Sequence, residues 1–161
     1  TCFGHCPGPI VRFVPRRWVT NRTWLTDSAA ETLALGKQLA AGFHPPLIIL
    51  LSGDLGAGKT TLAKGIISGL GVASEEEVTS PTFTLIHVFR NHCPVFHVDL
   101  FRVEGPHDLE TLGLEDVFSE PAIVLIEWPE KLSLQTDWPL LRVQIGHAGA
   151  DRRRIHCAGL D

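Results

Sequence analysis

The sequence contains no methionine, and its 14 Lys and Arg residues are outnumbered by 18 Asp and Glu. The formal net charge of -4 argues against a protein that binds nucleic acid by itself, because such proteins usually need a basic face. No apolar run approaches the roughly 20 residues of a bilayer span, and the N-terminus lacks the continuous apolar segment of a signal peptide. We therefore expect a soluble, cytoplasmic protein without membrane contact, in which any role on RNA runs through partner proteins.

Cysteine is also scarce, and a chain of this size needs no disulfide to fold; the four cysteines are Cys2, Cys6, Cys93 and Cys157. Two groups of nearby side chains resemble halves of a zinc site: Cys2, His5 and Cys6, and then His92, Cys93 and His97. A second C-x-x-C pair is missing, and the first of these groups lies in a stretch without structural pattern. We therefore favour no metal site at either group.

The first 22 residues differ from the rest in composition. They carry prolines, glycines and basic residues with no sustained hydrophobic period, so we interpret residues 1–22 as a poorly ordered N-terminal extension. Because residue 1 is not methionine, we expect a processed or wrongly assigned start. Residues 23–161 are long enough to form one domain with its own core.

A glycine-rich segment follows the apolar run Leu47–Leu51 and matches the pattern G-x-x-x-x-G-K-[ST] of a phosphate-binding loop (P-loop). The glycines let successive backbone N–H groups point into one concavity that an anionic phosphate chain fills. Lys59 reaches the outer phosphates, and the hydroxyl of Thr60 can hold a magnesium ion. The pattern therefore predicts nucleotide binding by Gly56, Ala57, Gly58, Lys59, Thr60 and Thr61.

Hydrophobic patterning predicts the elements around this loop. Ser28 and Glu31 form a capping box in which each satisfies a backbone donor of the other, and a helix then runs to about Ala41. Uniformly apolar strands indicate burial on both faces and hence a parallel sheet; the predicted strands are Leu47–Leu51, Thr84–Phe89, Val95–Leu100, Ala122–Ile126, Leu140–Ile145 and Arg153–Ala158. Further helices are expected after the loop and over Asp108–Leu112 and Leu114–Phe118. The expected α/β fold is a P-loop NTPase-like three-layer fold with a mostly parallel central sheet and a C-terminal antiparallel hairpin.

Two acids stand where strands of this sheet end. Asp99 follows Val95–Val98 and Glu127 follows Ala122–Ile126, and ligands of open α/β sheets bind outside such carboxyl ends. Magnesium takes hard oxygen ligands, so Thr60, Asp99 and Glu127 are the candidate metal ligands. We favour Glu127 on the ion and Asp99 on the attacking water, although the reverse assignment is open, and an acid after a strand can also simply mark a turn.

Two other features have both a functional and a structural interpretation. Ser80–Thr84 lies between the loop helix and the Asp99 strand, where a segment ordered by the terminal phosphate is often found; it is otherwise a strand-entry turn. Trp128 directly follows Glu127 and either packs in the core, covers the nucleotide or contacts a partner.

Four motifs occur in order: the P-loop, Ser80–Thr84, His97–Arg102 and Ile126–Glu130. Together they closely resemble the TsaE family (formerly YjeE), small bacterial ATPases of threonylcarbamoyladenosine biosynthesis in tRNA. The resemblance covers about Thr26 to Arg154. Family members typically carry Tyr where Phe101 stands, and the N-terminal extension is not a family feature.

The resemblance implies an Mg-dependent ATPase that is slow alone and acts on the complex of TsaD and TsaB, which nucleotide turnover resets between rounds. The tRNA is then reached only through that complex. Carried over to this sequence, ATP lies on Gly56–Thr61 and Mg²⁺ on Thr60 and Glu127. The expected catalytic residues are Lys59, Asp99, Glu127 and Trp128. The base of the nucleotide is expected near Ser28–Thr32.

Two other classes of protein share the loop and the sheet. A small-molecule or nucleoside kinase needs an arginine-bearing lid, for which Arg152–Arg154 is the candidate, although these residues fall in a predicted terminal strand. A nucleotide-gated binding module would never hydrolyse ATP, and only phosphate release stimulated by a partner separates it from the ATPase.

Overall fold

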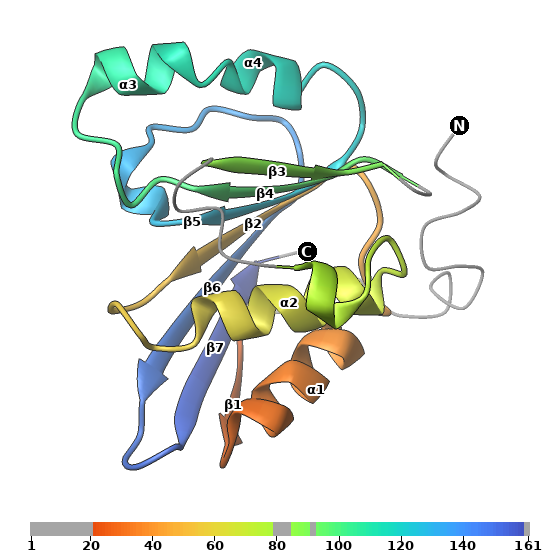
Figure 1. Ribbon diagram of the computed structural model, residues 1–161, viewed down its shortest axis with the longest axis vertical. Helices are drawn as coiled ribbons and strands as arrows, with labels where there is room; N and C mark the ends of the chain where they lie inside the picture. The colour runs from red at the N-terminus through yellow and green to blue at the C-terminus, as the bar shows by residue number, and fades with distance from the viewer. Residues whose placement is uncertain (1–20, 79–84, 91–92, 160–161) are drawn as a thin grey trace.

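The computed structural model describes residues 21–78, 85–90 and 93–159, and these build one seven-stranded sheet of order β1-β7-β6-β2-β5-β4-β3 (Figure 1). The pairs β2–β5, β2–β6 and β4–β5 are parallel, whereas β1–β7, β6–β7 and β3–β4 are antiparallel. The strands are β1 (Arg22–Thr26), β2 (Leu47–Ser52), β3 (Ile86–Phe89), β4 (Val95–Asp99), β5 (Ile123–Glu127), β6 (Leu140–His147) and β7 (Arg153–Gly159). The expected parallel centre and C-terminal hairpin are thus confirmed.

Helices cover both faces of the sheet, which completes the expected three layers. The pair α1 (Ala29–Ala40) and α2 (Lys59–Gly69) packs on one face, and the short helices α3 (Pro106–Thr111) and α4 (Leu114–Val117) lie on the other (Figure 1). Two single turns of 3-10 helix, η4 (Glu75–Glu77) and η5 (Pro129–Lys131), complete the elements.

The central strands are buried on both faces, as their uniform apolarity predicts. In β2, Leu47, Ile49 and Leu51 pack in the core under α1 and α2, while Ile48 and Leu50 pack in the core on the α3–α4 side. This burial fixes the strand rigidly, so the loop that follows Ser52 starts from a defined point at the carboxyl edge of the sheet.

Ordered structure begins earlier than the sequence predicted. We expected the first element at Ser28, but β1 precedes it and pairs antiparallel with β7, from Arg22 opposite Cys157 to Thr26 opposite Arg153. Only Thr26 of this edge strand is buried, so β1 lacks the apolar signal of a core strand. The rest of the predicted extension, residues 1–20, lies outside the described residues.

The start of α1 has half of the predicted capping box. The side chain of Ser28 accepts a hydrogen bond from the backbone N–H of Glu31 at 3.1 Å, as expected. The carboxylate of Glu31, however, accepts from the backbone N–H of Asp27 rather than from that of Ser28. The chain enters the helix from β1, and this places Asp27 within reach of the carboxylate.

Cysteine chemistry departs from expectation at one position. Cys93 is disulfide-bonded, although nothing in the sequence required a disulfide. Cys157 is free and buried, and burial raises the pKa of its thiol to about 12. In the described part of the chain, no helix is both long and apolar enough to cross a membrane.

Glycine allows α1 and α2 to approach closely under the loop. A Cβ atom added to Gly65 would lie 2.2 Å from the carbonyl oxygen of Leu33. Because that oxygen belongs to the backbone, the helices must separate, and we expect Gly65→Ala to cost about 3 kcal/mol of overpacking. Alanine regains only about 1 kcal/mol of helix propensity. The free energy of unfolding, measured by urea titration, should fall by roughly the difference, about 2 kcal/mol.

Gly146→Ala is the matched control for this substitution. A Cβ atom added to Gly146 meets nothing within 4 Å, and the residue has no positive φ. Its free energy of unfolding should stay unchanged or rise by up to about 1 kcal/mol, because alanine restricts the unfolded chain. Equal effects of the two substitutions would contradict the close helix packing.

Candidate functional site

The loop between β2 and α2 is shaped by glycines with positive φ, namely Gly53 (152°), Gly56 (79°) and Gly58 (105°). Gly53 is also needed for space, because a Cβ there would lie 2.2 Å from the carbonyl oxygen of Ile145. The loop therefore turns sharply against the end of β6 and delivers Gly58 as the residue before α2. Ala57 is fully buried and is not among the residues that line the cavity beside the loop, and its backbone N–H donates to the carbonyl of Asp54 at 3.0 Å.

Lys59 is only 5 % exposed, although it is charged, and it folds back over the loop. Its Nζ donates to the carbonyl oxygens of Gly53 at 2.6 Å and Asp54 at 2.8 Å, and lies 4.4 Å from the ring centre of Trp128. Burial lowers the pKa of this ammonium, and the charges of Glu127 and Asp99 oppose that shift. A cation held this firmly inside the loop is suited to bind an anion that enters the concavity.

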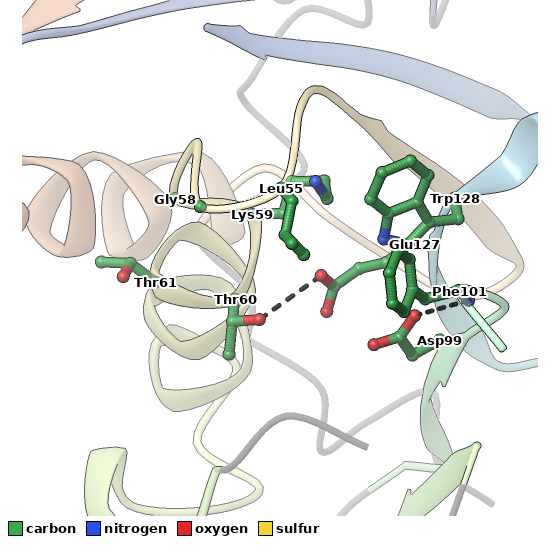
Figure 2. A pocket seen from close by; sticks show the side chains of 10 residues that line it. Leu55, Gly58, Lys59, Thr60, Thr61, Asp99, Phe101, Glu127 and Trp128 are labelled. Carbon is green, nitrogen blue, oxygen red and sulfur yellow. Dashed lines mark hydrogen bonds between the residues drawn. The ribbon is translucent and has the colours of Figure 1, made fainter. Parts of the chain in front are cut away.

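The two predicted acids are neighbours in the sheet. Asp99 of β4 and Glu127 of β5 stand opposite each other in a parallel pair, and they are 3 % and 2 % exposed. Thr60 Oγ1, at the start of α2, donates to Glu127 Oε1 at 3.4 Å (Figure 2). Asp99 Oδ1 accepts from the backbone N–H of Phe101 at 2.9 Å, which fixes its direction. Both strand ends thus place a carboxylate beside the loop.

A buried histidine, His97, contacts the second acid, a contact that the sequence did not predict. His97 Nε2 lies 2.6 Å from Glu127 Oε2, and the His97 side chain has no exposed surface. The available signal was strand periodicity: His97 precedes Asp99 by two residues, so both side chains emerge on the same face of β4. The imidazole therefore lies two residues before Asp99 along β4, on the face of the strand that carries Asp99.

Trp128 adopts a left-handed backbone conformation, φ 61° and ψ 50°, which is uncommon for a large side chain. This conformation turns the ring back over the site, where it packs on Phe101 with ring centres 5.0 Å apart. Figure 2 shows the indole beside Glu127 and the loop, on the other side of the cavity from Thr61. The structure therefore places Trp128 at the site and not in a distant part of the core.

A cavity of about 310 Å³ lies between these groups, and Figure 2 shows its lining. Its walls combine a cation, two carboxylates, hydroxyls and the N-terminal end of α2 with an aromatic and aliphatic rim. The lining residues are Leu55, Gly56, Gly58, Lys59, Thr60, Thr61, Asp99, Phe101, Glu127 and Trp128. With the exception of Ala57, every residue predicted from the sequence for this site contributes to the lining.

A second hollow of about 250 Å³ adjoins the loop at the start of α1. It shares Gly58 and Thr61 with the loop and adds Ala29 and Thr32. This is where the sequence analysis expected the base of a nucleotide, and that assignment stays a prediction. Arg153, which was predicted to begin the terminal strand and was also the candidate for a kinase lid, lines this hollow as well.

The donor set suits a magnesium ion bound together with phosphates. Among the described residues, no group of three His, Cys, Asp or Glu side chains could hold a metal ion by itself. Magnesium rarely uses such a cage: it keeps several waters and takes one or two carboxylates or hydroxyls together with phosphate oxygens. Thr60 Oγ1 and Glu127 Oε1 provide such a pair of oxygens. The segment Ser80–Thr84 lies outside the described residues.

One protein family matches most of this chain, and its named relatives agree with that match. The family described as threonylcarbamoyl adenosine biosynthesis protein TsaE matches residues 26–155. A protein of Bacillus subtilis named tRNA threonylcarbamoyladenosine biosynthesis protein TsaE is 39 % identical over 133 residues, which is 82 % of each chain. The protein of the same name from Nostoc is 44 % identical over 117 residues, or 70 % of each chain.

The fold is matched as well. The crystal structure of YdiB from Bacillus subtilis superposes with a TM-score of 0.68 at 33 % identity, covering 89 % of this chain and 88 % of that one. The region matched by the family begins at the last residue of β1 and ends within β7, so it includes strands β2 to β6 and all of the cavity lining. The chain therefore belongs to the TsaE family of proteins involved in tRNA threonylcarbamoyladenosine biosynthesis.

Proposed function

We propose that the protein is an Mg-dependent ATPase that acts on the TsaD–TsaB complex and resets it between rounds of tRNA modification. One observation carries the proposal: Lys59, Thr60, Asp99 and Glu127 come from three separate elements and line a single cavity. A structural role would not require a buried ammonium and two buried carboxylates at one point, because such groups are costly to desolvate.

The chain's own groups have distinct roles in this proposal. Lys59 and the N–H groups of the loop bind the outer phosphates, and Thr60 and Glu127 hold Mg²⁺, which supplies charge neutralisation at the terminal phosphate. Asp99 orients the attacking water, since its carboxylate lines the cavity and the Phe101 N–H holds Oδ1 in place. Thr60 Oγ1 and Glu127 Oε1 lie 3.4 Å apart, and this neighbourhood of two oxygens supports this assignment over the reverse one.

The rim of the cavity supports action on a partner. Leu55 is 71 % exposed and Phe101 is 38 % exposed, and both line the cavity that binds the phosphates. Exposed apolar groups at a site mark a surface that another protein can cover. Hydrolysis can bias a partner only if the two nucleotide states bind it differently. A partner seated on this rim would lie next to the bound nucleotide, which supports such a difference.

Purification with the partners tests this proposal. The TsaD–TsaB pair should retain this protein to different extents in ATP and in ADP, and should stimulate phosphate release from ATP. Absence of stimulated release at saturating TsaD–TsaB would favour the nucleotide-gated binding module. A labelled metabolite formed from radioactive ATP would favour a kinase, with Arg153 beside the loop as its candidate arginine.

Trp128 should report nucleotide binding directly. Because its ring lies 4.4 Å from Lys59 Nζ, a phosphate that attracts Lys59 changes the surroundings of the indole. We expect Mg·ADP to change the tryptophan fluorescence of the wild type and to leave that of Trp128→Phe unchanged. Trp138, which packs on Phe118 in the α3–α4 layer, is the matched control. A signal that persists in Trp128→Phe and disappears in Trp138→Phe would contradict the arrangement.

A further inference from the structure

We infer that His97 is a positioning residue that fixes the orientation of the Glu127 carboxylate and so determines which of its oxygens faces the phosphate-binding cavity. The inference rests on the proposed function, because the cavity-facing oxygen matters only if Glu127 holds Mg²⁺. It assigns a task to a buried group that none of the roles above uses.

The geometry divides the carboxylate between two partners. Oε2 of Glu127 lies 2.6 Å from His97 Nε2, whereas Oε1 lies 3.4 Å from Thr60 Oγ1. Without such a contact, the χ3 torsion that orients a Glu carboxylate has only a broad preference. A hydrogen bond at one oxygen removes that freedom, so only Oε1 remains directed toward Thr60 and the cavity.

The other ring nitrogen identifies the tautomer. His97 Nδ1 is buried and has no hydrogen-bond partner among the described residues. The carboxylate of Glu127 can only accept, so Nε2 must carry the proton, and Nδ1 is left as an unprotonated acceptor. The Nδ1–H form would turn the Nε2 lone pair toward the carboxylate and lose this hydrogen bond, so the Nε2–H form is favoured.

The position of His97 in the sheet makes the contact rigid. It lies in β4, which is buried throughout and pairs with β5 in parallel, so the imidazole and Glu127 are held by the same backbone ladder. In metal sites, partners that hold a ligand in this way typically change metal affinity or activity about 10- to 100-fold when they are removed. Loss of His97 should therefore weaken the binding of nucleotide with Mg²⁺ and leave the binding of nucleotide without Mg²⁺ unchanged.

Three substitutions separate this role from mere packing. His97→Leu removes the donor, while His97→Gln places an amide N–H near the position of Nε2. His87→Leu is the control, because His87 stands opposite His97 on β3 and its ring packs on Phe89. The readout is the ADP affinity with and without Mg²⁺, measured by calorimetry on the full chain.

In the wild type, Mg²⁺ should strengthen ADP binding. We expect His97→Leu to lose about 10-fold or more of that gain, while its ADP affinity without Mg²⁺ is unchanged, and His97→Gln to recover most of the loss. His87→Leu should behave like the wild type. If His97→Leu keeps the full gain, the role of His97 is wrong although the proposed function stands. If Mg²⁺ has no effect on the wild type, the proposed function itself fails, and the role of His97 with it.

A spectroscopic measurement keeps the inference testable if His97→Leu does not fold. Nitrogen-15 spectra of the histidine rings in the wild type should show the Nε2–H tautomer at His97, and Glu127→Gln should shift that signal. An Nδ1–H tautomer would overturn the inference, as would a His97 signal that is insensitive to Glu127→Gln.

Discussion

Lys59→Met should reduce ATP turnover in the presence of TsaD–TsaB by about 100- to 1,000-fold, the usual loss when a preorganised charge is removed from a developing anion. The Nζ that is lost is held by the carbonyl oxygens of Gly53 and Asp54 inside the loop. Among the described residues that line the cavity, no other cation could replace it. Phosphate release under saturating ATP measures the effect.

The fold should survive this substitution. Methionine has a similar length and no charge to desolvate, and burial of the ammonium is already unfavourable, as the lowered pKa of Lys59 indicates. Lys37→Met is the matched control, because Lys37 is a half-exposed lysine of α1 that pairs with Glu75. Wild-type turnover by a folded Lys59→Met protein would contradict the role assigned to this ammonium.

Much of the fold was predictable because its signals are local. The run Leu47–Leu51 predicted a strand buried on both faces. The glycines and Lys59 that follow it predicted the loop and the start of α2. Asp99 and Glu127 were identified because each stands at the end of an apolar strand. The parallel pairing of β4 with β5 then brings these two ends together without any further sequence signal.

Other features depend on contacts that a local pattern does not contain. β1 exists because Arg22–Thr26 pairs with Arg153–Cys157 at the far end of the chain, and its own residues are mostly exposed. The left-handed backbone of Trp128 is set by the packing of its ring on Phe101, not by a preference of tryptophan.

His97 shows the same limit at the site. Its spacing from Asp99 predicts a shared face of β4, but the hydrogen bond to Glu127 requires the pairing with β5. The sequence therefore predicted which residues line the cavity better than it predicted the contacts between them.

Glu127→Ala should abolish repeated rounds of tRNA modification while a single round by the TsaD–TsaB pair survives. The substitution removes the oxygen that faces Thr60, and with it the proposed hold on Mg²⁺, so turnover should fall by about 100-fold or more. Modified tRNA per TsaD–TsaB complex, followed beyond one equivalent, separates the first round from later ones.

Glu127→Ala also leaves the His97 N–H buried without an acceptor, which costs about 1–3 kcal/mol of folding free energy. Glu127→Gln separates this effect from the loss of charge, because its amide oxygen can still accept from His97. We expect Glu127→Gln to keep wild-type stability and to fail in repeated rounds nearly as completely as Glu127→Ala.

Glu130→Gln, which changes an exposed acid three residues further on, should modify tRNA normally. Repeated rounds at the wild-type rate with Glu127→Ala would exclude resetting by ATP hydrolysis at this site, because Glu127 is the residue that places a carboxylate oxygen beside Thr60 Oγ1.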